Sequence, residues 1–550
     1  MVNSLPPTQI NSLHRFDNQS AQDCILAAID IGTNSIHMVI VEIDIELPAF
    51  TIIAREKDTV RLGDRDPQSG ELTPEAINRS VACLKRCRNL AQSLGAVQTI
   101  AVATSAVREA PNGKDFIKQV QSELGLCINL ISGYEEARRI YLGVLSCMEF
   151  HGQPHIIIDI GGGSTEIILG DSHKPRFLSS TKVGAVRLNQ DFVTSDPISK
   201  SELNYLHAYV RGMLERAVDN LKTHLQPGEI PRMMGTSGTI KTLAIIHALR
   251  QFNSEPNSLN GYQFTRDDLH SLVDYLASLN YQQRLNVAGI TDRRAEIIVP
   301  GAIILLETME MLDLPSITIC ERALREGVIV DWMLSHGLIE DRLRYQGSVR
   351  ERSVINIAQK YRVNLNYSER VANFALTLFD QTRGYLHNWG GEARELLWAA
   401  AILHNCGVHI SHAAHHKHSY YLIRNGELLG FTETEVDLIA NIARYHRKSK
   451  PKKKHDHYQN LPNEEQLLVR QVSALLRVAV ALDRRNIGGI EAINCEYQET
   501  EKELLLQLFP SQPDDDCALE LWNLEIKKEA FEEEYKTKLV AELVGVSSKD

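Results

Sequence analysis

The sequence has no long apolar run. Its 550 residues contain no stretch that reaches the ~20 consecutive apolar residues needed by a membrane-spanning helix. Residues 1–23 are polar, include Pro6 and Pro7, and lack the basic start and apolar centre of a secretory signal. We therefore expect no membrane span, and we expect residues 1–23 to form a flexible extension.

Cysteine is scarce and shows no pairing pattern. The nine cysteines are scattered along the chain, and no two of them form a CxxC motif. An odd, scattered set argues against a disulfide framework and against a structural zinc site. The distribution is typical of reduced thiols, so we expect a cytoplasmic protein.

An overall excess of positive charge is also absent, since the net charge is −11. The local distribution of charge matters more for binding than its sum, however. Residues Arg444–His455 are densely basic. This segment is either a solvated loop or a surface for a polyanion, and both interpretations stay open. The sequence contains no recognisable nucleic-acid-binding module, so we expect no specific nucleic-acid partner.

Apolar residues make up 43% of the chain, which is enough for several buried cores, and the length favours three or four domains. The first half alternates strand and helix patterns. An apolar run ends at Asp30, a second strand is expected over Ile36–Asp44, and Thr73 and Pro74 have the residue types of a helix N-cap and first helical position. This alternation predicts an α/β architecture.

One motif occurs twice in this α/β region. Asp30-Ile-Gly-Thr-Asn-Ser35 is echoed by Asp159-Ile-Gly-Gly-Gly-Ser164, and each copy lies between two strand-like runs. Such repetition predicts two related lobes that face each other. We place them at residues 24–138 and 139–340.

The pattern changes after the second lobe. Residues 341–485 read as helices with histidine-rich turns. The runs Ile490–Tyr497, Leu504–Phe509 and Ala518–Ile526 read as strands, which predicts a small α+β domain over residues 486–550.

The two repeated turns have the residues of a phosphate site. A glycine-rich turn exposes backbone N–H groups that bind anions, and carboxylates at strand ends, Asp30 and Asp159, can hold Mg²⁺ or position water. Glu166 lies two residues beyond Ser164 and so faces the same side of its strand. Ordinary hairpins, with Glu166 in a cross-strand ion pair, are the competing interpretation. The expected phosphate-binding residues of the turns are Gly32, Thr33, Asn34, Ser35, Gly161, Gly162, Gly163 and Ser164.

A pair of glutamates begins a helix between the two turns. Ser132 and Glu135 match the S-x-x-E capping box, which gives Glu135 a structural role. Glu136 has no such role, and it is a candidate general base for water. The alternative, that both glutamates merely favour the helix start, stays open. Further phosphate-binding candidates are Arg108, which follows a strand, and Gly235, Ser237 and Gly238, which enter a helix.

In order from Ala27 to Trp332, the chain contains AAIDIGTNSIHMVI, ATSAVREA, ISGYEEARRIYLGV, IIIDIGGGSTEIILG, GTSGTIKTLA and ALREGVIVDW. Together these segments resemble the exopolyphosphatase/guanosine pentaphosphate phosphohydrolase family of the actin-like, Hsp70-like and sugar-kinase-like superfamily. The resemblance implies two actin-like lobes with a phosphate-binding cleft between them. It also implies Glu136 as the catalytic base, Asp159 and Glu166 as its acidic partners, Arg108 as a phosphate ligand, and Mg²⁺ (or Mn²⁺) held by Asp30, Asp159 and Glu166.

The helical region resembles the HD-like domain of the long-form members of that family. It contains His404-Asn405 where an HD phosphohydrolase has a metal-binding His-Asp pair. Neutral Asn is a weaker ligand, so we expect no second active site. Given the resemblance to this family, we interpret the basic segment as a polyphosphate track. The track is formed by Arg444, His446, Arg447, Lys448, Lys450, Lys452, Lys453 and Lys454.

The resemblance therefore implies an exopolyphosphatase that removes terminal phosphate from inorganic polyphosphate, and it implies a homodimer. Hydrolysis of guanosine pentaphosphate (pppGpp) at its 5′ end is the alternative within the family, because both activities share the core motifs. A sugar-kinase-like enzyme and a nonenzymatic nucleotide or polyphosphate sensor are alternatives of other classes. The EEAR and SAVREA motifs argue against the first, and the presence of Glu136, Asp159 and Glu166 argues against the second.

Overall fold

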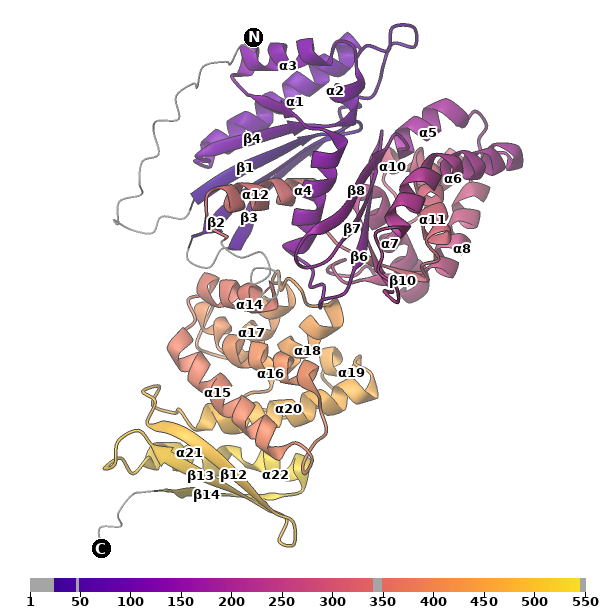
Figure 1. The fold of residues 1–550 in the computed structure, drawn as a ribbon. Helices are drawn as coiled ribbons and strands as arrows, with labels where there is room; N and C mark the ends of the chain where they lie inside the picture. The colour runs from indigo at the N-terminus through magenta and orange to yellow at the C-terminus, as the bar shows by residue number, and fades with distance from the viewer. Residues whose placement is uncertain (1–23, 46–48, 340–348, 545–550) are drawn as a thin grey trace, which may run out of the picture.

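The computed structural model describes residues 24–45, 49–339 and 349–544. The expected N-terminal extension, residues 1–23, lies outside them. The chain forms an upper part with two lobes and a lower part with helices and a small sheet (Figure 1). Within the described ranges, no helix is long and apolar enough to cross a membrane.

The first lobe is built on a five-stranded sheet in the order β3-β2-β1-β4-β5. The first three strands are antiparallel, and the last two join them in parallel. Helix α1 begins as predicted, because the Thr73 side chain accepts a hydrogen bond from the Ala76 N–H and Pro74 is the first helical residue. The elements are β1 (Cys24–Ile31), β2 (Ile36–Asp44), β3 (Ala49–Asp58), α1 (Pro74–Ser93), β4 (Gln98–Ala103), α2 (Ser105–Glu109), α3 (Gly113–Leu124), β5 (Ile128–Leu130) and α4 (Gly133–Leu145).

The second lobe repeats this plan. Its sheet has the order β10-β11-β9-β6-β7-β8, in which β8-β7-β6-β9-β11 reproduces the first sheet and β10 is added at one edge. The repetition inferred from the two glycine-rich motifs is therefore present in the fold. The elements are β6 (His155–Ile160), β7 (Thr165–Gly170), β8 (Pro175–Thr181), α5 (Ala185–Phe192), α6 (Lys200–Lys222), β9 (Arg232–Thr236), α7 (Ser237–Phe252), β10 (Gln263–Thr265), α8 (Arg266–Ser278), α9 (Tyr281–Leu285), α10 (Asp292–Ala295), α11 (Ile298–Met311), β11 (Ser316–Ile319) and α12 (Leu324–Ser335).

Two helices join the lobes. The α4 and α12 helices pack on each other, and they share one apolar core with residues of both sheets, including Leu26 of β1 and Ile168 of β7. Figure 1 shows both helices beside the first sheet, where they face the second. The boundary expected after residue 138 therefore falls inside α4, because that helix belongs to the interface rather than to one lobe.

The lower part contains a helical bundle and a three-stranded sheet in the order β12-β13-β14. Bundle and sheet share one apolar core, so residues 486–544 pack as a continuation of the helical part. The elements are α14 (Val349–Lys360), α15 (Leu365–Thr382), α16 (Gly391–Leu403), the 3₁₀ helix η1 (Cys406–His409), α17 (His415–Arg424), α18 (Glu433–Arg444), α19 (Asp456–Gln459), α20 (Asn463–Ala481), β12 (Ile490–Gln498), β13 (Glu503–Pro510), α21 (Ala518–Lys527), α22 (Glu529–Tyr535) and β14 (Lys538–Leu543).

The strand predicted over Ala518–Ile526 is wrong, because these residues form the α21 helix. Apolar and polar residues partly alternate there, which imitates a strand. The helix instead buries Glu520, whose carboxylate accepts from Arg485, and Leu524 four residues later. The third strand of the sheet is β14, which pairs in parallel with β13.

Candidate active site

The two glycine-rich turns meet across the space between the lobes. A Cβ atom built on Gly162 would lie 3.0 Å from the Thr33 Cβ, and one built on Gly163 would lie 2.9 Å from the Thr33 hydroxyl oxygen. The same Thr33 hydroxyl is 3.0 Å from the Ser105 hydroxyl at the start of α2. Glycine is therefore required where the two turns approach each other.

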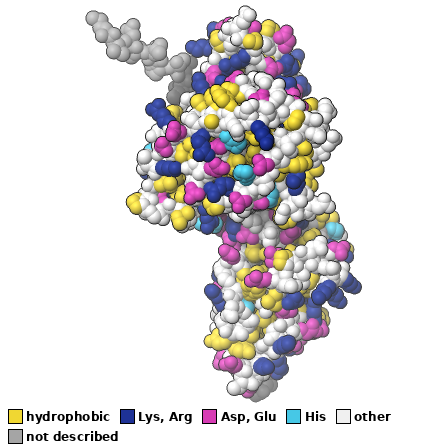
Figure 2. All heavy atoms as spheres, turned by 90° about the vertical axis from the view of Figure 1, so that its right-hand side faces the viewer, with side chains coloured by type: hydrophobic (Ala, Val, Ile, Leu, Met, Phe, Trp, Pro, Cys, Tyr) yellow, Lys and Arg dark blue, Asp and Glu magenta, His cyan; other side chains and the backbone are white. Residues whose placement is uncertain are grey.

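A cleft of about 350 Å³ opens between these turns. In the space-filling view, histidine and charged side chains of both signs gather over the middle of the two-lobe part (Figure 2). The structure brings together most of the residues that the sequence selects. Those that line the cleft are Asp30, Gly32, Thr33, Asn34, Ser35, Glu136, Asp159, Gly161, Gly162, Ser164, Glu166, Ser237 and Gly238. Arg108, Gly163 and Gly235 are not among its lining residues.

Glu136 lies in the first turn of α4, and its side chain is buried. Its Oε2 atom accepts a hydrogen bond from Arg108 Nη1 at 3.2 Å, and the same nitrogen donates to the Ile131 carbonyl at 2.9 Å. Burial raises the pKa of Glu136 well above its ordinary value, the neighbouring Glu166 raises this pKa further, and Arg108 lowers it. Arg108 thus acts on the cleft through Glu136, although it does not line the cleft itself.

Glu135 points elsewhere. The Ser132 side chain caps the helix by accepting from the Glu135 N–H, as predicted. The second half of the predicted capping box is absent, because the Glu135 carboxylate instead accepts from Arg138 and Arg139, each at 2.7 Å. These cations compete successfully for the carboxylate, so Glu135 anchors the outer face of α4.

Three further carboxylates crowd the cleft. Asp159 and Glu166 lie directly opposite each other on β6 and β7, and Ser180 donates to Glu166 at 2.7 Å. Burial raises the pKa of Glu166 to about 8 and that of Asp159 to about 7, and the next largest cause in each case is a neighbouring carboxylate. Burial also raises the pKa of Asp30 to about 6. Burial and neighbouring carboxylates therefore outweigh the cations of the cleft and raise all three pKa values.

Several cations of the cleft were not selected from the sequence. Lys241, Arg294 and Arg325 line it, and each lowers the pKa of Asp159. Arg325 also donates to His37 Nδ1 at 3.0 Å, and burial together with Arg325 lowers the pKa of His37 to about 2, so its imidazole is neutral. Partly buried Lys and Arg beside glycine-rich turns are suited to the oxygens of a phosphate chain.

The third turn, at the start of α7, only partly fits the prediction. Ser237 has a φ of 89°, which is strained for a residue with a side chain, and its buried hydroxyl has no hydrogen-bond partner within residues 24–45, 49–339 and 349–544. Gly238 lies against Arg294, where a Cβ atom would clash with the guanidinium. Gly235 is wrong as a phosphate ligand, because it packs against Ile317 and Ile240 in the core of the lobe. The strained Ser237 is the part of this turn that is oriented for a ligand.

The carboxylates of the cleft suit a hard divalent cation, but they do not by themselves form a closed metal site. In the described part of the chain, no group of three or more His, Cys, Asp or Glu side chains converges to hold a metal ion. Asp30, Asp159 and Glu166 therefore do not form a preformed three-carboxylate centre. Mg²⁺ commonly binds through one or two carboxylates and completes its shell with water and substrate phosphates, so these crowded carboxylates suit it.

Histidines of the helical part are mostly internal. His404, His415 and His446 are buried, and the Nε2 atoms of His415 and His446 lie 3.3 Å apart. Burial lowers the pKa of His404 to about 4 and that of His446 well below its ordinary value. His446 is therefore wrong as a member of an exposed track, because the chain turns it inward just after α18 ends.

The rest of the basic segment is divided between structure and surface. Arg444 stacks over Tyr420, Arg447 donates to His415, and Lys450 pairs with Glu529 and Glu533. Figure 2 shows basic side chains grouped at one edge of the lower part. The exposed members of the segment are Lys448, Lys452, Lys453 and Lys454.

Comparison with known proteins agrees with this geometry. The Ppx/GppA phosphatase family model matches residues 39–336, and the model of the family's domain III matches residues 349–528. Two similar curated proteins are named guanosine-5′-triphosphate,3′-diphosphate pyrophosphatase. That of Vibrio parahaemolyticus is 29% identical over 86% of this chain and 90% of its own, and that of Pseudoalteromonas atlantica is 29% identical over 88% and 92%.

Among solved structures, an exopolyphosphatase from Cytophaga hutchinsonii is 27% identical, with a TM-score of 0.51 over 57% of this chain and 98% of its own. The fold consists of two related α/β lobes with a cleft between them. The chain belongs to the Ppx/GppA phosphatase family. The family relationship makes it a hydrolase of phosphoanhydride bonds.

Proposed function

We propose that the chain removes the 5′-terminal phosphate of guanosine 5′-triphosphate 3′-diphosphate. The observation that carries the proposal is the position of Glu136, a buried carboxylate fixed by Arg108 at the edge of a cleft lined by two glycine-rich turns. The choice of substrate is supported by the names of the two curated relatives, which align with this chain along most of its length.

In this mechanism the terminal phosphate lies between the two glycine-rich turns, which donate backbone N–H groups to its oxygens. Glu136 takes a proton from a water molecule as the water oxygen forms a bond to the terminal phosphorus. The bond from that phosphorus to the bridging oxygen breaks, and the electron pair leaves with the shortened nucleotide. Lys241, Arg294 and Arg325 offset the negative charge of the phosphate chain.

Asp30, Asp159 and Glu166 would hold the Mg²⁺ ion, or Mn²⁺ in its place. When bound, the ion supplies positive charge that stabilises the phosphate oxygens during the transfer. Arg108 has an indirect role, because it holds the Glu136 carboxylate and keeps its pKa from rising further.

Removal of terminal phosphate from inorganic polyphosphate is the second candidate. It is favoured by the exposed lysines after α18 and by the solved relative named an exopolyphosphatase. The two candidates are separated by phosphate release from pppGpp, from polyphosphate of several hundred residues and from ATP, measured side by side. The proposal requires the largest kcat/KM for pppGpp, and a larger value for long polyphosphate would replace it with the second candidate.

We also propose a homodimer in a reducing compartment such as the cytoplasm. All nine cysteines are free thiols. The α21 helix exposes Leu519, Trp522 and Ile526, each more than half exposed, along one face. A helix face of this kind supports a contact between protein chains. Light scattering of the purified chain tests this, and a monomer at micromolar concentration would contradict it.

A further inference from the structure

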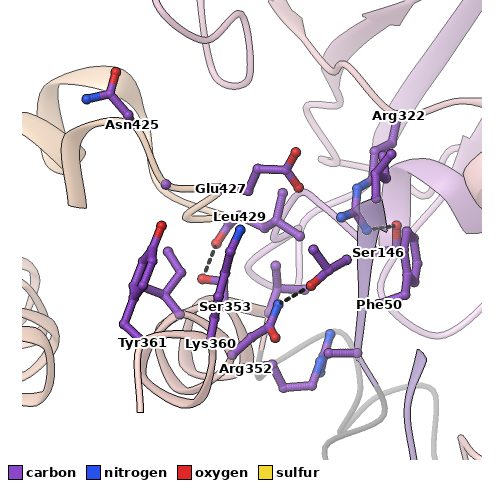
Figure 3. Close-up of a pocket in the computed structure, with 17 residues that line it drawn as sticks. Phe50, Ser146, Arg322, Arg352, Ser353, Lys360, Tyr361, Asn425, Glu427 and Leu429 are labelled. Carbon is purple, nitrogen blue, oxygen red and sulfur yellow. Dashed lines mark hydrogen bonds between the residues drawn. The ribbon is translucent and has the colours of Figure 1, made fainter. Parts of the chain in front are cut away.

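A second cavity lies at the junction between the two-lobe part and the helical part (Figure 3). It has a volume of about 180 Å³, and its walls come from β3, from α14 and from the loop at residues 425–429. None of the described residues lines both this cavity and the catalytic cleft. In Figure 3, Arg322 and Phe50 lie on one side of the cavity, and Lys360 and Tyr361 lie on the other.

Arg322 is the central residue of this cavity. It is only 5% exposed, its guanidinium lies 4.2 Å from the centre of the Phe50 ring, and its Nη1 donates to the Ser146 hydroxyl at 3.1 Å. Its Nη2 atom is buried and has no hydrogen-bond partner among the residues that the structure describes. A buried charged donor without an acceptor is costly, which indicates that an acceptor occupies the cavity in the functioning protein.

The charges around the cavity point to an anion. Arg352 and Lys360 of α14 line it together with Arg322. Among the described residues that line it, the single carboxylate is that of Glu427, which is 54% exposed and lies 3.8 Å from Arg55. A guanidinium fork with a free nitrogen, beside further cations, matches the geometry of a phosphoryl group better than that of a neutral ligand.

The cavity is connected to the catalytic cleft by the segment before α12. A third cavity shares Arg322 and Glu427 with the junction and shares Arg55, Glu321 and Glu326 with the cleft. The carbonyl of Arg322 accepts from Thr236 at 3.0 Å, and that of Glu321 accepts from Lys241, one of the cleft cations. A ligand in the junction cavity is therefore connected, through the segment before α12, to residues that line the catalytic cleft.

We propose that this cavity, the junction site, binds a phosphoryl group through Arg322. The group belongs either to a free anion such as pyrophosphate or to the far end of a substrate held in the cleft. Bound there, it contacts β3 on one side and α14 on the other, so it ties the helical part to the first lobe. This binding site is additional to the proposed function. Its binding of a free anion does not depend on which substrate the cleft hydrolyses, whereas binding of the far end of a substrate requires that the cleft hydrolyses long phosphate chains.

Pyrophosphate titration of the full chain by calorimetry tests the junction site. We expect two sites per chain in the unaltered protein, and we expect Arg322→Gln to weaken the junction site alone by about 10- to 100-fold, as loss of a charge-assisted hydrogen bond does. Arg250→Gln is the matched control, because Arg250 stacks on Tyr275 away from both cavities. Lys360→Gln provides a second variant if Arg322→Gln does not fold.

Crystals of the full chain soaked in tungstate, a phosphate analogue, should show anomalous density within hydrogen-bonding distance of Arg322 Nη2. The proposal would be overturned by anomalous density at the catalytic cleft alone together with unchanged pyrophosphate binding in Arg322→Gln and Lys360→Gln. The KM values for tripolyphosphate and for long chains then identify whether the bound phosphoryl group belongs to the substrate or to a free anion. If the KM of Arg322→Gln rises for long chains but not for tripolyphosphate, the junction site binds the far end of the substrate. If the KM is unchanged for both substrates, the junction site binds a free anion.

Discussion

The Nη1 atom of Arg108 donates to the Ile131 carbonyl and to the Glu136 carboxylate, at 2.9 and 3.2 Å. The first bond fixes the guanidinium to the chain just before α4, and the second fixes the carboxylate at the start of that helix. Arg108 therefore holds Glu136 in position and lowers its pKa, against the larger effect of burial.

The first prediction concerns pH. A general base must be deprotonated, and the pKa of Glu136 is already raised by burial and by Glu166, so activity falls as the pH drops through this raised value. Because Arg108 lowers that pKa, Arg108→Met should move the acid limb of the kcat/KM profile to higher pH. Arg138→Met is the control, since Arg138 pairs with Glu135 and Asp331. If the acid limb of Arg108→Met lies at the same pH as that of the unaltered protein, ionisation of Glu136 does not cause the limb.

The second prediction concerns the contact between the glycine-rich turns. Gly162→Ala places a Cβ atom 3.0 Å from the Thr33 Cβ and 3.2 Å from Val186, so these neighbours must shift by a small distance. Because a displacement of ~1 Å in a substrate-binding group lowers kcat/KM by up to about 100-fold, we expect a smaller but measurable loss. Gly212→Ala is the matched control, because no atom lies near its Cβ position on α6. Equal kinetics for the two variants would show that the close approach is not needed.

Removal of divalent ions is the third test. Burial and neighbouring carboxylates raise the pKa values of Asp159 and Glu166 to about 7 and about 8, so a bound divalent cation would stabilise their ionised forms. We expect phosphate release to stop in excess EDTA and to return with added Mg²⁺ or Mn²⁺. Full turnover in EDTA, with the ion content checked by atomic absorption, would exclude the proposed ion.

The fourth prediction distinguishes the two substrates at the exposed part of the basic segment. Replacing Lys448, Lys452, Lys453 and Lys454 with Gln should leave kcat/KM for pppGpp unchanged, because these lysines do not line the cleft. For long polyphosphate the variant should bind more weakly and show a flatter dependence on salt, since fewer counterions are released.

A matched variant replaces Lys114, Lys118, Lys200 and Lys222, which are exposed on other helices of the two lobes. It should behave as the unaltered protein with both substrates. An equal loss with pppGpp and with long polyphosphate in the first variant would instead indicate damage to the fold. Circular dichroism of both variants provides that check.

Local signals in the sequence predicted much of this molecule. The repeated Asp-Ile-Gly motifs at Asp30 and Asp159 gave the two lobes, because each motif sits between strands that the fold repeats in the same order. Thr73 with Pro74 marked a helix start correctly. The separation of Glu136 from Glu135 also followed from local pattern, although the partner of Glu135 turned out to be Arg138.

Features that depend on distant segments could not be found in this way. Lys241, Arg294 and Arg325 are far apart in the chain and meet only because α7, α10 and α12 begin or end at the same cleft. His446 lies among basic residues in the sequence, yet the packing of α17 on α18 buries it. The α21 helix has an alternating pattern because its exposed face carries Leu519 and Trp522.

The most direct test of the account is the rate of phosphate release from saturating pppGpp by Glu136→Gln and by Glu135→Gln. Both changes remove one carboxylate from neighbouring positions of α4, but only Glu136 lines the cleft. We predict a loss of ~10²–10⁴-fold in kcat for Glu136→Gln, as for removal of a general base, and little change for Glu135→Gln. Near-normal turnover by a folded Glu136→Gln protein, or an equal loss in both variants, would contradict the assignment of Glu136 as the base.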